Sequence, residues 1–234
     1  MSEIQSIPDS VMTTDLALAR LAELDTNTVS DALDFLEIEG ATWGIVPLWN
    51  CPKITGRAST IQLGPKSDTK PTVHLISPVI DAVSSHNRIL VIAGGREGIS
   101  CWGDILANAA KGRGIRGSVI DGLSRDIEGS ESIGYPVYGR GVTMISARNR
   151  VIQLSSGQPV RFAGIEVHED DYVIADRCGT VFIAANRIQE VLELAEKIAQ
   201  RQNGMVQAVR RGRSVAEVMH DSAFDAINTG NKNG

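Results

Sequence analysis

The stretch GDILANAAKGRGIRGSVIDGLSRD, residues 103–126, decides the fold that this sequence predicts. Asp104 begins a helix, Gly112 and Gly114 end it, and SVID starts the strand that follows. Upstream, NRILVIAGG (residues 87–95) has the β-branched run of a fully buried strand, and a glycine-containing loop leads from it to the helix. Together the three pieces predict a β-α-β unit.

The hand of this unit determines where its ends lie. A β-α-β crossover is almost always right-handed, so the two strands are expected to be parallel. The end of the first strand, the start of the helix and the end of the second strand then share one edge of the sheet, where open α/β sheets usually bind ligands. Asp104 and the Arg125–Asp126 pair are therefore expected to converge there. The predicted apolar face of the helix consists of Ile105, Leu106, Ala109 and Ala110.

The residues at this edge have complementary chemistry. Free backbone N–H groups at the helix start, residues 103–106, favour an anion such as a carboxylate. Arg125 can clamp that carboxylate or hold an enolate oxygen. Asp126 suits Mg²⁺, which takes only one or two protein carboxylates and keeps most of its waters. Because Asp104 is well placed to orient a catalytic water, the set indicates a lyase site.

Each of these side chains also has a purely structural interpretation. Asp104 can complement the helix dipole, and Asp126 can cap a short helix over IEGSES, residues 127–132. Arg125 can pair with a surface carboxylate at little energetic value. Spacing alone leaves the structural and the catalytic interpretations both open.

Helices are expected at both ends of the chain and strands between them. Two helical pieces fill residues 16–39, the second starting near Asp25 or Thr26, and a long amphipathic helix follows residue 185. The intervening β-type runs end at Gly, Asp or Asn and read KITGRASTIQL, NRILVIAGG, GSVIDG, PVYGRGVT, RFAGIEV and DYVIADRCGTVFIA.

Composition narrows the class of protein. No linker divides the sequence, so we expect one domain over residues 1–234, with flexible ends at about 1–15 and 225–234. A net charge of −5 with scattered basic residues argues against nucleic acid as a partner. No leader or membrane span is visible, which predicts a cytoplasmic protein. The three cysteines are far apart, so neither a disulfide framework nor a structural zinc site is expected.

Four motifs occur in one order across most of the chain. They are TVSDAL at 28–33, the block at 103–126, PVYGRGVT at 136–143 and DYVIADRCGTVFI at 171–183. Asp104, twenty residues and then Arg125–Asp126 resemble the D-x20-R-D signature of the 4-hydroxy-4-methyl-2-oxoglutarate aldolases, in the RraA-like family that also contains the RNase E regulator RraA. The resemblance implies an α/β fold, an αββα sandwich of the swivelling β/β/α type with central sheets and helices at both ends. It also implies a homotrimer or homohexamer with active sites between subunits.

For the site, the resemblance implies a metal-dependent lyase acting on a small 2-oxo acid. Asp126 would hold a divalent metal, Mg²⁺ or Mn²⁺, and Arg125 would contact the pyruvyl oxygen. The pyruvyl carboxylate would lie on the backbone of Gly103, Asp104, Ile105 and Leu106. Retro-aldol cleavage of a 4-hydroxy-2-oxo acid leaves pyruvate enolate, which the metal and Arg125 stabilise, while water oriented by Asp104 takes the C4 hydroxyl proton. Oxaloacetate decarboxylation passes through the same enolate and is expected as a side activity.

The sequence departs from the aldolase pattern at two places. In the last helix Gln202 aligns where family aldolases tend to carry a glutamate that reaches a neighbour's site, and a neutral amide cannot act as a base. Glu37 or Glu39, at the end of the second helix, are candidates to supply that carboxylate across a subunit interface. The usual Pro-Gly-Asp turn reads Glu-Asp-Asp at 169–171, a change that we expect to be structural.

Three other functions or mechanisms make different demands on the sequence. An RraA-type regulator would bind an RNase E-like partner without catalysis, and we expect such regulators often to lack the full set of acids and metal ligand. A Schiff-base aldolase needs a desolvated lysine, whereas the lysines here mostly sit in loops or at element ends. A menaquinone methyltransferase needs a glycine-rich S-adenosylmethionine loop after the first strand, and the sequence has no such loop.

Overall fold

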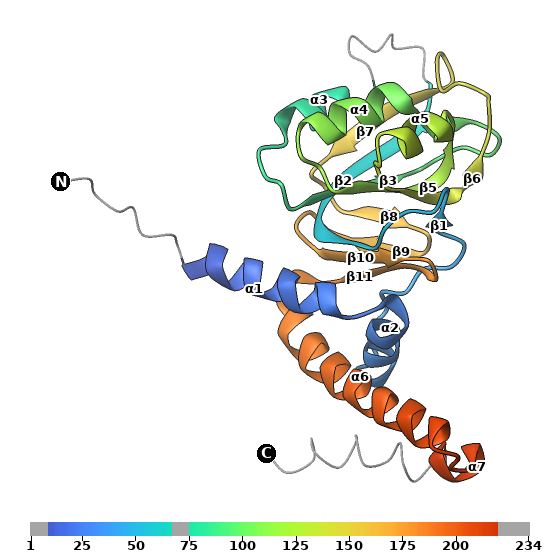
Figure 1. Ribbon diagram of the computed structural model, residues 1–234. Helices are drawn as coiled ribbons and strands as arrows, with labels where there is room; N and C mark the ends of the chain where they lie inside the picture. The colour runs from blue at the N-terminus through green and yellow to red at the C-terminus, as the bar shows by residue number, and fades with distance from the viewer. Residues whose placement is uncertain (1–8, 67–74, 220–234) are drawn as a thin grey trace.

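A nine-stranded sheet, bent so that its two halves face each other, organises the molecule (Figure 1). The computed structural model describes residues 9–66 and 75–219. Its strands are β1 (Val46–Pro47), β2 (Ile54–Pro65), β3 (Arg88–Ala93), β4 (Ser100–Trp102), β5 (Gly117–Ser124), β6 (Val137–Val142), β7 (Val151–Ser156), β8 (Val160–Phe162), β9 (Ile165–Val167), β10 (Tyr172–Asp176) and β11 (Gly179–Ile183). Its helices are α1 (Asp9–Glu23), α2 (Thr26–Phe35), α3 (Ser77–Ala82), α4 (Asp104–Gly112), α5 (Ile127–Ser132), the 3-10 turn η1 (Ala185–Arg187), α6 (Ile188–Arg210) and α7 (Val215–Val218).

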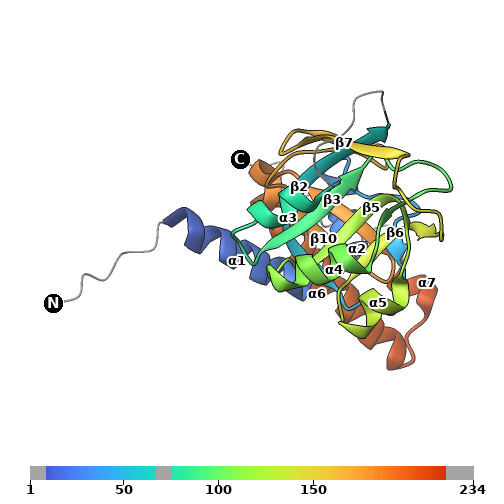
Figure 2. The same cartoon turned by 90° about the horizontal axis from the view of Figure 1, so that it is seen from above.

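The strand order shows how the sheet bends. It runs β1-β6-β5-β3-β2-β10-β11, with β4 added to β5, β7 added to β2, and β8–β9 forming a separate hairpin. The long strand β2 belongs to both halves, because it pairs in parallel with β3 and antiparallel with β10. α3 and α4 lie across one half (Figures 1 and 2), whereas α1, α2 and α6 cover the other. The expected αββα sandwich is therefore confirmed.

Apolar side chains fill three spaces: one between the two halves of the sheet, and one between each half and the helices that cover it. Side chains that alternate along each strand supply two of these spaces. In β3, Ile89 faces the opposite half of the sheet, while Leu90 packs toward α3 and α4. In β10, Val173 shares the space between the halves, while Ile174 packs against α1, α2 and α6. Successive side chains of a strand point to opposite faces, so a strand covered on both faces is apolar throughout. This explains the continuous apolar run of residues 87–95.

The β-α-β unit predicted from residues 103–126 is present. β3 and β5 are parallel, with Ile89 opposite Gly117, and α4 connects them. The helix begins at Asp104 as predicted, and its glycine stop includes Gly114, whose φ of 74° is in the left-handed region. The helix start and the carboxyl end of β5 consequently lie at the same sheet edge.

The predicted apolar face of α4 is correct only in part. Ala110 is buried and Leu106 packs against the core below it, but Ile105 is 78% exposed and Ala109 is also exposed. Ala107, which was not expected, is fully buried instead. Ile105 and Ala109 line a cleft where a core was expected.

Strands β1, β4 and β7 and helix α3 were not predicted. β4 lies in the segment read as a flexible loop, and it pairs in parallel with the end of β5. β7 pairs antiparallel with the second half of β2, over a bulge at Gln62 and Leu63. α3 has six residues, as does α5, which is the short helix considered above over residues 127–132. Elements this short carry too few residues for a periodic pattern to reveal them.

The predicted cap of the second N-terminal helix is present, but the first helix begins earlier than the sequence predicted. Asp25 precedes α2, and its carboxylate accepts a hydrogen bond from the Thr28 amide at 2.7 Å, as the predicted cap requires. α1 already begins at Asp9, inside the end that was expected to be flexible. Residues 1–8 and 225–234 lie outside the described residues. Within the described part of the chain, no helix combines the length and apolar character needed to cross a membrane.

Candidate functional site

A cleft of about 530 Å³ opens at the sheet edge where α4 begins and β5 ends. Every residue predicted for the substrate and metal site from the 103–126 stretch lines this cleft, namely Gly103, Asp104, Ile105, Leu106, Arg125 and Asp126. Residues from β4, from the start of α3, from α4 and from the loop between β6 and β7 with the first residue of β7 complete the described walls. The convergence expected from the crossover is therefore seen in the structure.

The backbone at the end of β5 holds Arg125 and Asp126 toward the cleft. The Arg125 amide donates to the carbonyl of Trp102 at 3.0 Å, which ties the end of β5 to β4. Asp126 has a left-handed φ of 55° at the N-terminus of α5, and its side chain makes no cap hydrogen bond. The capping role considered for Asp126 is thus not what its side chain does.

Arg125 and Asp126 form an ion pair with each other. The Arg125 Nε lies 3.1 Å from Asp126 Oδ2, and both side chains are a little over one third exposed. Within the described residues, Asp126 Oδ1 and the two terminal guanidinium nitrogens of Arg125 have no other protein partner. One carboxylate oxygen and two N–H-bearing nitrogens are left for a ligand.

The start of α4 presents unused backbone donors to the same cleft. The first intrahelical bond of α4 runs from the Ala107 amide to the Gly103 carbonyl at 3.1 Å, so the amides of residues 104–106 have no acceptor inside the helix. No side chain among the described residues caps them. Together with the helix dipole they form a site for an anion.

Two glycines allow the close approach of these elements. A Cβ on Gly103 would lie 2.7 Å from Asp126 Oδ2, and a Cβ on Gly129 of α5 would lie 2.7 Å from Asp104 Cβ. Real Cβ atoms are not found at such distances, so a side chain at either position would push an acid of the cleft aside. Glycine at these positions sets the geometry of both carboxylates.

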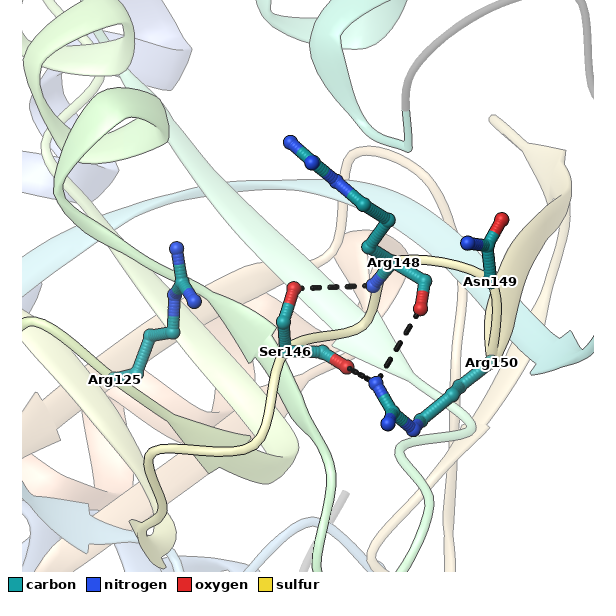
Figure 3. A pocket seen from close by; sticks show the side chains of 5 residues that line it. All are labelled: Arg125, Ser146, Arg148, Asn149 and Arg150. Atoms are coloured by element: carbon teal, nitrogen blue, oxygen red, sulfur yellow. Dashed lines mark hydrogen bonds between the residues drawn. The ribbon is translucent and has the colours of Figure 1, made fainter.

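A second hollow, of about 560 Å³, adjoins the cleft (Figure 3). It is lined by Arg125, Ser146, Arg148, Asn149 and Arg150, four of which also line the first cleft. This basic loop was not predicted from the sequence. The sequence ARNR at 147–150, separated by three residues from the end of a predicted strand at Thr143, is the signal that could have indicated it.

Two thirds of the chain match a known protein family. A model of the RraA-like family, described as Aldolase/RraA, matches residues 26–182. The chain belongs to the RraA-like family. The family predicted from the four sequence motifs is thereby confirmed.

Individual relatives give this RraA-like chain further context. DlpA of Legionella pneumophila is 31% identical over 208 residues, which are 89% of this chain and 34% of DlpA, so the chain spans about a third of that protein. A protein of Halalkalibacterium halodurans, provisionally named 4-hydroxy-4-methyl-2-oxoglutarate aldolase, is 28% identical over 186 residues, 77% of this chain and 82% of that one. Streptomyces coelicolor RraAS2, described as an unusual member of the RNase ES inhibitor RraA family, has a TM-score of 0.74 at 25% identity, covering 82% of this chain and 96% of that one.

The candidate cross-subunit acids of this RraA-like protein lie away from the cleft. Glu37 and Glu39 line a separate hollow at the end of α2, together with Arg161. Within the chain they are not brought to Asp104, and their role across an interface stays a prediction. Gln202 donates from Nε2 to Asp31 Oδ2 at 2.9 Å, so it joins α6 to α2. Burial of the Asp31 carboxyl raises its pKa, and the hydrogen bond from Gln202 opposes that shift.

The Glu-Asp-Asp turn at 169–171 is structural, as expected. Glu169 accepts from the Thr60 amide at 2.8 Å, and Asp170 has a left-handed φ of 69°. Asp171 accepts from the amides of His168 and Ala185 at 2.7 and 3.0 Å. These bonds tie the turn to β2 and to the start of the η1–α6 segment.

The donors around the cleft fit a metal that substrate and water help to hold. No group of three or more His, Cys, Asp or Glu side chains suited to a metal occurs among the described residues. Mg²⁺ does not need one, because it commonly binds through one or two carboxylates and keeps several waters. Asp126, with Oδ1 free of protein partners in the part of the chain described, supplies such a carboxylate. Mn²⁺ suits the same oxygen ligands.

Proposed function

We propose that this protein is a divalent-metal-dependent lyase that cleaves 4-hydroxy-2-oxo acids to pyruvate by a retro-aldol reaction. The observation that carries the proposal is the convergence of Asp104, Arg125 and Asp126 with the free amides of α4 around one cleft. The relative provisionally named 4-hydroxy-4-methyl-2-oxoglutarate aldolase supports the same reaction class. Oxaloacetate decarboxylation, which forms the same enolate, is proposed as a side activity.

The backbone and Arg125 orient the substrate. The carboxylate of the 2-oxo acid accepts hydrogen bonds from the amides of residues 104–106, where the helix dipole favours negative charge. The C2 oxygen then lies toward Arg125, whose terminal nitrogens have no protein partner among the described residues. A guanidinium preorganised near that oxygen stabilises the charge that develops as the enolate forms.

Asp126 would hold Mg²⁺ or Mn²⁺, which when bound acts as a Lewis acid toward the 2-oxo group and lowers the energy of the enolate. Asp104 orients a water that takes the proton of the C4 hydroxyl. The C3–C4 bond then breaks, C4 becomes a carbonyl carbon, and the electron pair is delocalised over C2, C3 and the C2 oxygen. Protonation at C3 gives pyruvate.

Covalent alternatives find no support among the described lining residues. Cys101 lines the cleft, but burial raises its pKa to about 12, so the thiol stays protonated and weakly nucleophilic at neutral pH. No lysine lines the described walls of the cleft, and Lys70 and Lys232 lie outside the described residues. A Schiff base requires a lysine in the cleft.

Pyruvate release tests the proposed function. Wild-type protein should produce pyruvate from 4-hydroxy-4-methyl-2-oxoglutarate, and more slowly from oxaloacetate, in a lactate dehydrogenase-coupled assay with Mg²⁺. EDTA should abolish the activity, and Mg²⁺ or Mn²⁺ in excess should restore it, because the cleft itself offers few ligands. Activity that persists in EDTA, or no release from either acid, would contradict the proposal.

The spacing between Gly103 and Asp126 gives a second test. Gly103→Ala should lower the rate of pyruvate release and the affinity for Mn²⁺ roughly 10- to 100-fold, the usual effect of disturbing the surroundings of a metal ligand, because its Cβ would lie 2.7 Å from Asp126 Oδ2. Gly112→Ala makes the same change at the other end of α4, where a Cβ meets nothing within 4 Å, and should leave both quantities unchanged. Equal activity of the two variants would show that the spacing is unimportant.

A regulatory role is the competing function, and the likeness to Streptomyces coelicolor RraAS2 favours it. A regulator would capture an RNase E-like ribonuclease and release no pyruvate. Both properties can be measured on one preparation, by pull-down and by the coupled assay. Capture without turnover would replace the lyase proposal.

A further inference from the structure

The cleft continues beyond Arg125 into the hollow formed by the loop after β6 (Figure 3). The two volumes, about 530 and 560 Å³, share Arg125, Ser146, Arg148 and Asn149 along their boundary. A ligand whose first carboxylate lies on the amides of α4 can therefore extend past Arg125 toward Arg148. The far end of a substrate would lie in this second hollow.

The loop that lines the hollow is fixed by its own hydrogen bonds. Arg150 donates from Nη1 to the carbonyls of Ser146 and Arg148 at 2.9 and 3.4 Å. The Arg148 amide donates to Ser146 Oγ at 3.1 Å, and Arg96 donates to the Arg150 carbonyl at 3.3 Å. Arg150 is thus used to shape the loop.

Arg148 differs from Arg150 because its side chain takes no part in this network. Its guanidinium points away from the backbone carbonyls that Arg150 binds (Figure 3), and no described residue pairs with it. The side chain is exposed, so it can meet a ligand without first breaking a contact. Arg148 is therefore free to bind an anion entering the hollow.

The charges along the two volumes are separated. Both described acids of the first cleft, Asp104 and Asp126, lie at its α4–α5 end. No acid occurs among the described residues that line the second hollow, where three arginines meet. A substrate with a single carboxylate would leave Arg148 without a counter-charge, whereas one with a second carboxylate would supply it.

We propose that Arg148 is a specificity-determining residue that selects 2-oxo acids carrying a second carboxylate at the end remote from the pyruvyl unit. This inference rests on the proposed function for the orientation of the substrate. The planar guanidinium matches a carboxylate in a bidentate geometry, and the loop held by Arg150 keeps its backbone in place. Selection then depends on the charge at the far end of the substrate.

A matched pair of ligands isolates this contact. 2-Oxoglutarate and 2-oxopentanoate have the same chain length, lack a 4-hydroxyl group, and differ at C5 in a carboxylate or a methyl group. In calorimetric titrations with Mg²⁺, wild-type protein should bind 2-oxoglutarate more tightly. Arg148→Gln should weaken 2-oxoglutarate binding roughly 10- to 100-fold and change 2-oxopentanoate binding by less than about twofold.

Two further variants separate charge, fork geometry and loop structure. Arg148→Lys keeps the charge without the guanidinium fork, so its loss for 2-oxoglutarate should be intermediate. Arg177→Gln removes an exposed arginine at the β10–β11 turn, away from both volumes, and should leave binding of both ligands unchanged. If the role of Arg148 were purely structural, Arg148→Gln would weaken the binding of both ligands equally.

The outcomes separate this inference from the function on which it rests. Selective loss of 2-oxoglutarate binding supports the role of Arg148, even where the coupled assay with 4-hydroxy acids detects no pyruvate and the lyase proposal fails. Equal effects on the two ligands, no effect of Arg148→Gln, or no binding of either ligand by the wild type would overturn the inference. Pyruvate release by a wild type that does not discriminate would overturn it while leaving the lyase proposal intact.

Discussion

The Asp126→Asn variant is expected to lose pyruvate release by at least about 1000-fold, because the proposed metal carboxylate becomes a neutral amide and enolate stabilisation is lost with it. Asparagine is the appropriate replacement at this position. Asp126 has a φ of 55°, which asparagine tolerates and alanine does not. The loss can then be assigned to charge, with little contribution from backbone strain.

Three measurements are needed for this variant. The coupled assay gives the rate, a Mn²⁺ titration gives the metal affinity, and thermal unfolding at fixed protein concentration shows whether the fold is retained. Asp81→Asn is the matched control, since Asp81 is 72% exposed and pairs only with Arg113 on the surface in the described structure. If Asp126→Asn retains wild-type turnover and Mn²⁺ affinity, then Asp126 is not the metal ligand.

Arg125→Met should lower the rate of pyruvate release by about 100- to 1000-fold, the usual effect of deleting a donor that stabilises a developing oxyanion. Arg125→Lys should recover part of the rate, because a point charge is restored without the two-nitrogen fork. Neither change is expected to disturb the fold much, since the Arg125 side chain is 39% exposed and its ion pair with Asp126 is worth little to stability.

Deuterium exchange isolates the step that Arg125 serves. Pyruvate incubated with enzyme and Mg²⁺ in D₂O should exchange its methyl protons through the enolate, and proton NMR measures the rate. Exchange should decrease in Arg125→Met in proportion to the loss of cleavage. Arg113→Met, a matched change at the far end of α4, should exchange at the wild-type rate. Normal exchange in Arg125→Met would exclude Arg125 from enolate formation.

Much of the fold could be predicted because local signals and topology agree. The apolar run at 87–95, the glycine stop at 112–114 and the strand that follows determine a parallel β-α-β unit. The burial of α4 could not be derived in the same way. Whether Ile105 or Ala107 faces the core depends on which side of the helix packs on the sheet, which is a property of tertiary packing.

The site, like the fold, could be predicted where it depends on the β-α-β unit and not where it depends on irregular loops or helix packing. Asp104 and Arg125–Asp126 meet because a crossover brings two distant segments to one edge, and sequence spacing is enough to infer this. Arg148 reaches the same cleft through β6 and an irregular loop, whose path no periodicity describes. The pairing of Gln202 with Asp31 likewise depends on how α6 crosses α2.

The proposed subsite for the first carboxylate consists of main-chain amides at the start of α4. An alanine scan would therefore not detect this subsite, because every replacement except proline retains the main-chain N–H donor. At Ile105, which is 78% exposed, drift can change the side chain while the donor persists. Detecting the contribution of these amides requires chemistry that alters the peptide bond itself, such as an ester linkage introduced by semisynthesis.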